Sequence, residues 1–179
     1  MLHAIGRKQR SDDLVGLLLD CHQRIRSFAG LAVTVGARMD ALPGEVVEVC
    51  SRVERYFSEA LPLHVQDEEE SILPRLHGRS HDVDVALERM REQHDRHLDL
   101  LRGLLDLSAA VRMAPGDEAV RWMLHDVALE LQADFEPHLQ AEERIIFPAI
   151  RSLVSTKEQE DIVGELRARR SSAMSSRLP

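Results

Sequence analysis

The chain repeats one pattern, which reads HVQDEEESILP at residues 64–74 and HLQAEERIIFP at residues 138–148. Each copy places a histidine four residues before the first of two adjacent glutamates and ends with an apolar residue followed by proline. Chance seldom repeats so many positions at one offset, here 74 residues. Because residues four apart share a face of an α-helix, each copy predicts a helix that directs one imidazole and one carboxylate to the same side.

A further histidine precedes each copy at nearly the same distance. His22 lies 42 residues before His64, and His94 lies 44 residues before His138. We interpret the two halves as repeats of one domain that fold against each other. The predicted parts are an N-terminal extension at residues 1–10, a bundle at 11–154 with repeats at about 12–78 and 80–150, and a short helix with a flexible tail at 155–179.

The composition is that of a globular helical protein. Its 179 residues are long enough to bury a core, 44% of them are hydrophobic and only 3% are aromatic. The net charge of −8 argues against a nucleic-acid or anionic-membrane surface. No apolar run approaches the ~18 residues of a membrane helix, and no signal-peptide core follows residues 1–10. We interpret Cys21 and Cys50 as buried thiols in a reducing compartment and expect a cytoplasmic protein.

Apolar residues recur at steps of three and four along four long stretches, which predicts four helices. A shorter amphipathic segment follows from Thr156 to about Arg170. Short loops join the long helices, so neighbours are expected to be antiparallel. The predicted fold class is all-α: an up-down-up-down four-helix bundle with a short additional C-terminal helix. That fifth helix either covers one end of the bundle or contacts a second copy in a homodimer, and the sequence leaves both alternatives open.

Two prolines interrupt the helical pattern just before the motif histidines. Pro62 precedes His64, and Pro137 precedes His138. An interior proline removes a backbone hydrogen bond and kinks a helix, so a kink at each site is expected. The alternative is that each helix breaks and restarts there.

The repeated polar residues predict a metal site inside the bundle. Burying an ionised glutamate costs roughly several kcal/mol unless a cation compensates for it. The apolar faces of these helices carry two such glutamates and four histidines but no lysine or arginine. The predicted ligands are His22, His64, Glu68, His94, His138 and Glu142. The alternative is an internal network of histidines and glutamates without metal.

The donor types narrow the choice of metal. Imidazole and carboxylate suit iron, manganese, zinc or copper. In two-metal sites the ions commonly lie ~3.5–4 Å apart, and Glu68 and Glu142, one from each repeat, are the expected bridges. Six donors leave positions open on two metal ions, so a small molecule is expected to bind there.

Other polar residues are assigned no ligand role. Glu69 and Glu143 are turned ~100° from their neighbours; either they hold a ligand histidine by its other nitrogen, or they are solvated or pair with Arg75 or Arg144. His97 remains open as a further ligand. Surface positions are expected for His3, His77, His81 and His125, and packing roles for Tyr56 and Trp122.

With both motif copies in place, the chain resembles the hemerythrin-like family and its HHE cation-binding domain over roughly residues 12–150. The family repeat has a histidine, then His-x3-Glu-Glu, then an apolar–proline ending. The resemblance implies a four-helix bundle and two iron ions joined by an oxo or hydroxo bridge, with manganese or zinc as alternatives. It implies the same ligands by position: His22, His64 and Glu68 from the first repeat, and His94, His138 and Glu142 from the second.

Two positions depart from the oxygen-carrying members of that family. Those carriers have a second histidine four residues after the first on the third helix, where this chain has Leu98, with His97 one position earlier. They also have an aspartate five residues after the fourth-helix histidine, where Glu143 stands. The pattern is therefore more similar to bacterial and regulatory HHE domains than to a dedicated oxygen carrier.

The leading functional hypothesis is a di-iron binding protein for sensing, storage or delivery of oxygen or a related small molecule such as nitric oxide or peroxide. The alternatives are a di-iron enzyme that acts on peroxide or nitric oxide, and an iron-handling domain. No activated nucleophile or acid–base pair stands apart from the ligand set, which makes an enzyme the weaker hypothesis. Neither nucleic acid nor membrane is an expected partner.

Overall fold

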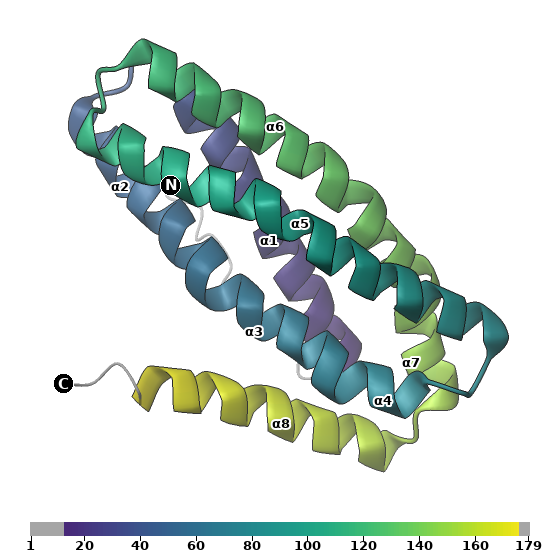
Figure 1. Ribbon diagram of the computed structural model, residues 1–179. Coiled ribbons are helices and arrows are strands. Elements are labelled where there is room, and N and C mark those ends of the chain that lie inside the picture. The colour runs from purple at the N-terminus through teal and green to yellow at the C-terminus, as the bar shows by residue number, and fades with distance from the viewer. Residues whose placement is uncertain (1–12, 176–179) are drawn as a thin grey trace, which may run out of the picture.

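A computed structural model describes residues 13–175, and all the regular structure in that range is helical (Figure 1). Three of its segments, labelled η, are π-helical turns within longer helices. In chain order the elements are α1 (Leu14–Ala37), α2 (Pro43–Arg55), η1 (Tyr56–Ala60), α3 (Leu61–Gln66), η2 (Asp67–Ile72), α4 (Leu73–Leu76), α5 (His81–Met113), α6 (Glu118–Ala141), η3 (Glu142–Ile146), α7 (Phe147–Leu153) and α8 (Thr156–Ser175). The predicted extension at residues 1–10 lies outside this range.

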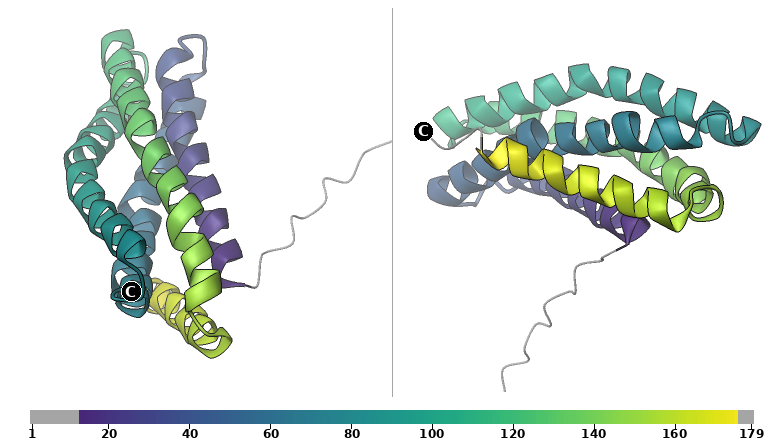
Figure 2. Two further views of the ribbon diagram at one scale, coloured as in Figure 1. Left: turned by 90° about the vertical axis from the view of Figure 1, so that its right-hand side faces the viewer. Right: turned by 90° about the horizontal axis from the view of Figure 1, so that it is seen from below.

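The long helices form a bundle around a shared interior. Helix α1 packs against α2 and α6, and α5 packs against the same two helices on the other side. The segments from α2 to α4 follow one another without a break, as do those from α6 to α7. Helix α8 crosses the outside of the bundle and contacts η2 and α1 (Figures 1 and 2). The prediction of a helical bundle with an additional C-terminal helix is confirmed.

Aspartates begin two of the long helices. The side chain of Asp13 accepts a hydrogen bond from the Gly16 amide, and Asp117 accepts one from the Val120 amide. These bonds satisfy amides that would lack partners in the first helical turn. At the other end of the chain, α8 continues past Arg170 through Ser175, so the tail predicted to be flexible is helical up to that residue. No helix between residues 13 and 175 has the length and apolarity that a membrane span requires.

Three prolines each follow a π-helical turn directly. Pro62, Pro74 and Pro148 occupy the second residue of α3, α4 and α7, immediately after η1, η2 and η3. A proline in an α-helix has no amide to donate and its ring meets the carbonyl four residues earlier. The wider π turn relieves this conflict, because the amide before the proline bonds five residues back, as from Leu73 to the carbonyl of Glu68. The prolines that close the two motif copies thus set the local backbone of the motif glutamates.

Pro62 and Pro137 behave differently, although the sequence suggested equivalent kinks. Pro62 follows the π turn η1, whereas Pro137 lies inside the α-helix α6. Neither helix breaks and restarts at its proline, because helical structure is continuous across both. The two prolines therefore lie in different local backbone, and a kink at each of them stays a prediction.

A polar layer divides the apolar core into two clusters. One cluster gathers around Ile25, Leu104 and Leu131, and the other gathers around Leu18, Met90 and Ile150 together with the buried residues of α8. Along α1, the buried His22 lies between Leu18 and Ile25. The motif residues thus sit at mid-height in the bundle, with apolar packing on both sides.

The contact between α1 and α6 gives a test of this packing. A Cβ atom on Gly36 would lie 2.7 Å from the His125 backbone nitrogen and 2.8 Å from the Arg121 carbonyl oxygen. We expect Gly36→Ala to lower the free energy of unfolding by about 1–3 kcal/mol, because two backbones must separate. Gly30→Ala is the matched control on the same helix, with no atom within 4 Å of the added group; it should raise stability by about 0.5–1 kcal/mol. Urea unfolding of both variants measures the difference, and equal effects would contradict the close approach.

Candidate metal centre

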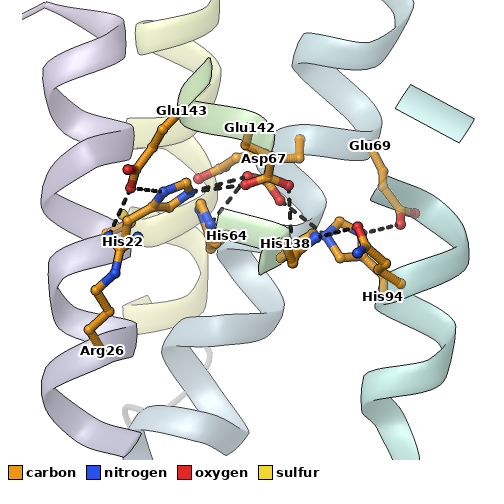
Figure 3. Close-up of polar contacts among 12 residues, drawn as sticks. His22, Arg26, His64, Asp67, Glu69, His94, His138, Glu142 and Glu143 are labelled. Carbon is orange, nitrogen blue, oxygen red and sulfur yellow. Dashed lines mark hydrogen bonds and ion pairs between the residues drawn. The ribbon is translucent and has the colours of Figure 1, made fainter. Parts of the chain in front are cut away.

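All six residues predicted as metal ligands meet in the polar layer of the bundle (Figure 3). His22 comes from α1, His94 from α5 and His138 from α6, while His64 is in α3. The two glutamates come from the π turns, Glu68 from η2 and Glu142 from η3. Every one of the six is buried, and each glutamate is only 1% exposed.

The first group of donors contains His22, His64, Glu68 and Glu142. One ligand atom from each lies within 4.8 Å of the others. His64 Nε2 is 3.2 Å from Glu68 Oε1, and His22 Nε2 is 3.0 Å from Glu142 Oε2. His22 Nε2 is also 4.0 Å from Glu68 Oε1. Both histidines belong to the first repeat, and Glu142 joins them from the second.

The second group contains His94, His138 and the same two glutamates, again with one ligand atom each within 4.8 Å. His94 Nε2 is 3.3 Å from Glu68 Oε2, and His138 Nε2 is 3.2 Å from Glu142 Oε1. Each carboxylate therefore directs one oxygen to each group. This is the geometry of two adjacent cation positions with both glutamates between them.

The chemistry of these donors fits a metal. Among the buried side chains of residues 13–175, both oxygens of Glu68 and both of Glu142 lack a hydrogen-bond donor of acceptable geometry. The Nε2 atoms of His22, His64 and His94 also lack a hydrogen-bond partner. Buried carboxylates are otherwise paired or hydrogen-bonded, because an unpaired buried charge is costly. The four carboxylate oxygens face imidazole nitrogens, and no arginine or lysine is among the donors. Two bound cations would neutralise these carboxylates.

The pKa values show how strongly the site demands positive charge. Burial lowers the pKa of His22 and of His94, but the Glu68 and Glu142 carboxylates outweigh burial and raise these values to about 10 and about 9. Burial lowers the pKa of His64 to about 4 and that of His138 to about 3. Without metal, protons on His22 and His94 therefore supply the compensating charge.

The two carboxylates also influence each other. Burial, followed by the neighbouring Glu68 carboxylate, raises the pKa of Glu142 to about 8. Burial acts in the same direction on Glu68, but His64, His22 and His94 outweigh it and hold the pKa of Glu68 below its ordinary value. Two facing carboxylates cannot both ionise easily without a cation, so a metal would remove this conflict.

The second glutamate of each motif holds a histidine of the opposite repeat. Glu143 Oε1 lies 2.9 Å from His22 Nδ1, and Glu69 Oε1 lies 2.8 Å from His94 Nδ1. Such a contact fixes the ring and leaves Nε2 free for a metal. Of the two roles considered for Glu69 and Glu143, the structure supports the contact with a ligand histidine. The arginine that pairs with Glu143 is Arg26, at 2.8 Å, and not Arg144.

Sequence reasoning missed two groups beside the site. Gln93 Oε1 lies 3.1 Å from His138 Nδ1, a contact that its place directly before His94 gave no reason to expect. Asp67 is fully buried beside Glu68, although its sequence position resembles that of a solvated acid. One feature of the sequence could have indicated a separate role for Asp67: the second repeat has Ala141 at the equivalent position, so the two motif copies differ there.

The remaining histidines take no part in either donor group. His97 is buried, but its Nε2 lies 3.1 Å from Asp134 Oδ2 and its ring packs 4.4 Å from that of Phe135. His77 and His81 are exposed, and His125 is intermediate with its Nδ1 3.0 Å from Asp126. Tyr56 packs in the core, stacked 4.2 Å from Phe28. Trp122 is 47% exposed and packs at the surface, with its ring centroid 5.1 Å from that of His125. His3 lies outside the described range.

A pocket of about 660 Å³ reaches the donors from the side between α3 and α5. His64, His94 and His138 are among the residues that line it. Most of its wall is apolar, formed by Phe57, Leu61, Leu98, Leu101, Leu105 and Phe135. A small molecule therefore has a largely apolar route from the surface to the donor groups.

The chain was compared with the models of known protein families. The model of the hemerythrin HHE cation binding domain matches residues 13–150, which include both donor groups and exclude α8. No curated protein matches the chain.

The raised pKa values of His22 and His94 predict that metal binding releases protons. At pH 7 both rings are protonated without metal, since their values are about 10 and about 9, and a metal needs the neutral ring. We expect Zn²⁺ to displace about one proton from each ring and a further one from Glu142, whose pKa of about 8 keeps it largely protonated at pH 7, and its affinity to rise with pH from 7 towards 10. Calorimetric titrations in two buffers of different ionisation enthalpy measure the release. Equal heats in both buffers would show that the two histidines are already neutral and that Glu142 is already ionised.

Proposed function

This chain belongs to the hemerythrin family of HHE cation-binding domains, and we propose that it holds two metal ions between its repeats. The proposed ligands are His22, His64, Glu68, His94, His138 and Glu142. One observation carries the proposal: four buried carboxylate oxygens without hydrogen-bond donors face the imidazole nitrogens of both repeats. In this proposal Glu68 and Glu142 bridge the ions, and each pair of histidines holds one of them.

We propose iron as the metal in both positions, with manganese and zinc as ions that the same donors accommodate. Two iron ions held in this way supply redox chemistry and coordination positions that the protein does not fill. Glu69, Glu143 and Gln93 orient the histidines, and the apolar layers on both sides keep bulk water away from the donors.

The small-molecule ligand is proposed from the pocket that ends at the histidines. Its wall is mostly apolar, although Glu69, Asp95 and Arg102 also line it, and the apolar part favours an uncharged molecule such as oxygen, nitric oxide or peroxide. The proposed role is binding for sensing, storage or delivery. A di-iron enzyme acting on peroxide or nitric oxide is the second candidate, because the same pocket would admit those substrates.

We also propose the bounds of the domain, the order of its helices and its location in the cell. We propose residues 11–154 as the domain, with its four long helical segments in up-down-up-down order; the short connections and the packing of α1, α2, α5 and α6 in a ring support this order. A cytoplasmic location is proposed from the two free cysteines, Cys21 and Cys50.

The ligand assignment predicts a ranking of four substitutions. After expression with iron, the protein should contain about two iron atoms per chain, as expected for a two-metal site. Glu68→Ala and Glu142→Ala should lose most of this iron, because each removes an oxygen from both donor groups. Glu69→Gln and Glu143→Gln should weaken binding by about 10- to 100-fold, as the loss of a histidine's outer partner usually does. Elemental analysis and competition with a chelator measure both effects.

Two results would count against the assignment. A protein that retains only traces of metal after iron supplementation would exclude the two-ion site. Greater metal loss from the Glu69 and Glu143 variants than from the Glu68 and Glu142 variants would mean that the ligand register is wrong by one residue.

Optical spectra separate the binding and enzyme hypotheses. An oxygen-binding protein should show a visible absorption band that disappears on degassing and returns with air. An enzyme acting on peroxide should instead consume it over repeated additions. A protein loaded with zinc should show no visible band and should not consume peroxide, because Zn²⁺ has a filled d shell and no redox chemistry.

A further inference from the structure

Helix α8 holds the residue that directly precedes Glu68. Asp67 has no exposed surface. Arg169 Nη1 donates to Asp67 Oδ1 at 2.8 Å, and Arg170 Nη2 donates to Asp67 Oδ2 at 2.6 Å. Both carboxylate oxygens are therefore fixed by arginines from a helix outside the bundle.

The same helix holds a second residue of η2. Arg169 Nη2 donates to Ser71 Oγ at 2.7 Å, and Ser71 Oγ donates to Glu165 Oε2 at 2.6 Å. Glu165 also pairs with Arg75 at 2.5 Å, just after η2. The turn that carries Glu68 is thus attached to α8 on both sides of the glutamate.

This attachment is absent from the other half of the site. At the position equivalent to Asp67 the second repeat has Ala141, and at the position equivalent to Ser71 it has Ile145. The turn η3 packs instead against α5 within the bundle. The arginines of α8 therefore hold the turn that carries Glu68, and the second repeat lacks the residues that would make the same contacts beside Glu142.

Helix α8 also reaches the residue before His22. The Arg170 side chain lies close enough to the Cys21 thiol to interact with it, and α8 packs against α1. Ile162, Val163 and Leu166 bury the first part of α8 in the core cluster that contains Leu14 and Leu18. Arg169 and Arg170 lie beyond this apolar anchor, where they contact η2.

We propose that α8 is a positioning helix for the metal centre and that Asp67, Arg169 and Arg170 are its positioning residues. This inference rests on the proposed function, because it concerns the placement of Glu68 as a shared ligand. A π turn is usually a single turn whose bonds span five residues, inserted into an α-helix. Arg169 and Arg170 fix the first residue of this turn at both carboxylate oxygens, so Glu68, the next residue, keeps one oxygen directed to each group.

Co²⁺ binding to the full chain tests the proposal, because Co²⁺ affinity and the intensity of its visible bands both report on ligand geometry. Asp67→Asn and the double variant Arg169→Gln/Arg170→Gln should each weaken Co²⁺ binding about tenfold or more, the range seen when a ligand's support is removed. Their bands should differ from those of the parent protein. Arg169→Lys/Arg170→Lys keeps the charge and should recover part of the affinity.

The matched control breaks a different ion pair of the same helix. Arg79 Nη2 lies 2.7 Å from Glu158 Oε1 at the beginning of α8, away from η2. Glu158→Gln removes that pair and should leave Co²⁺ affinity and spectrum unchanged. Far-UV circular dichroism and thermal melts show which variants fold, and titrations run well below their melting temperatures. If Asp67→Asn does not fold, the double arginine variant decides the result.

The possible outcomes separate the two proposals. If the Asp67 and arginine variants bind Co²⁺ as tightly as the parent while Glu68→Gln loses it, α8 does not position the site. If the Glu158 variant loses as much affinity as the others, α8 acts only through general stability and the positioning role is wrong. If Glu68→Gln also binds Co²⁺ normally, the proposed metal ligands themselves are wrong.

Discussion

The structure depends on two carboxylates that face each other inside an apolar bundle. Glu68 and Glu142 are almost completely buried, and neither accepts a hydrogen bond of good geometry. Without a cation, one must take a proton or the surrounding histidines must become charged. The division of the core into two apolar clusters follows from this polar layer, because no continuous apolar packing can pass through it. The attachment of α8 borders the same layer.

The two repeats hold each other through an exchange of acidic side chains. In each motif the first glutamate enters the centre, and the second contacts a histidine on the first helix of the other repeat. Neither half can therefore arrange its own histidines without the other. Separation of the repeats would leave His22 and His94 without their partners, which makes one cooperative unit the natural consequence of the duplication.

Much of this arrangement was predictable from the sequence, since it follows from periodicity. The shared face of His64 and Glu68 and the duplicated pattern identified all six donors that the structure brings together. Contacts that depend on tertiary packing were not predictable. Gln93 faces His138 only because α5 and α6 meet at that height, and the burial of Asp67 depends on where α8 crosses η2. The unequal behaviour of Pro62 and Pro137 likewise depends on whether a π turn precedes the proline.

The π turns change the angle around the helix axis at which the later buried residues lie. The continuous helical segment from α2 to α4 buries His64, Glu68, Ile72 and Leu76. The segment from α6 to α7 buries His138, Glu142, Ile146 and Ile150. Each run advances by three successive steps of four residues. In an uninterrupted α-helix every such step overshoots a full turn by ~40°, so the last residue would lie ~120° around the axis from the first. One wider turn in each run absorbs that overshoot. An unbroken spacing of four, with a proline outside the buried row two residues before its last member, is therefore a phase correction encoded in the chain. Deleting a single residue within either turn would lower the overshoot from ~120° to ~20°, so the turn could close to a regular α-helix with everything after it still directed to the interior.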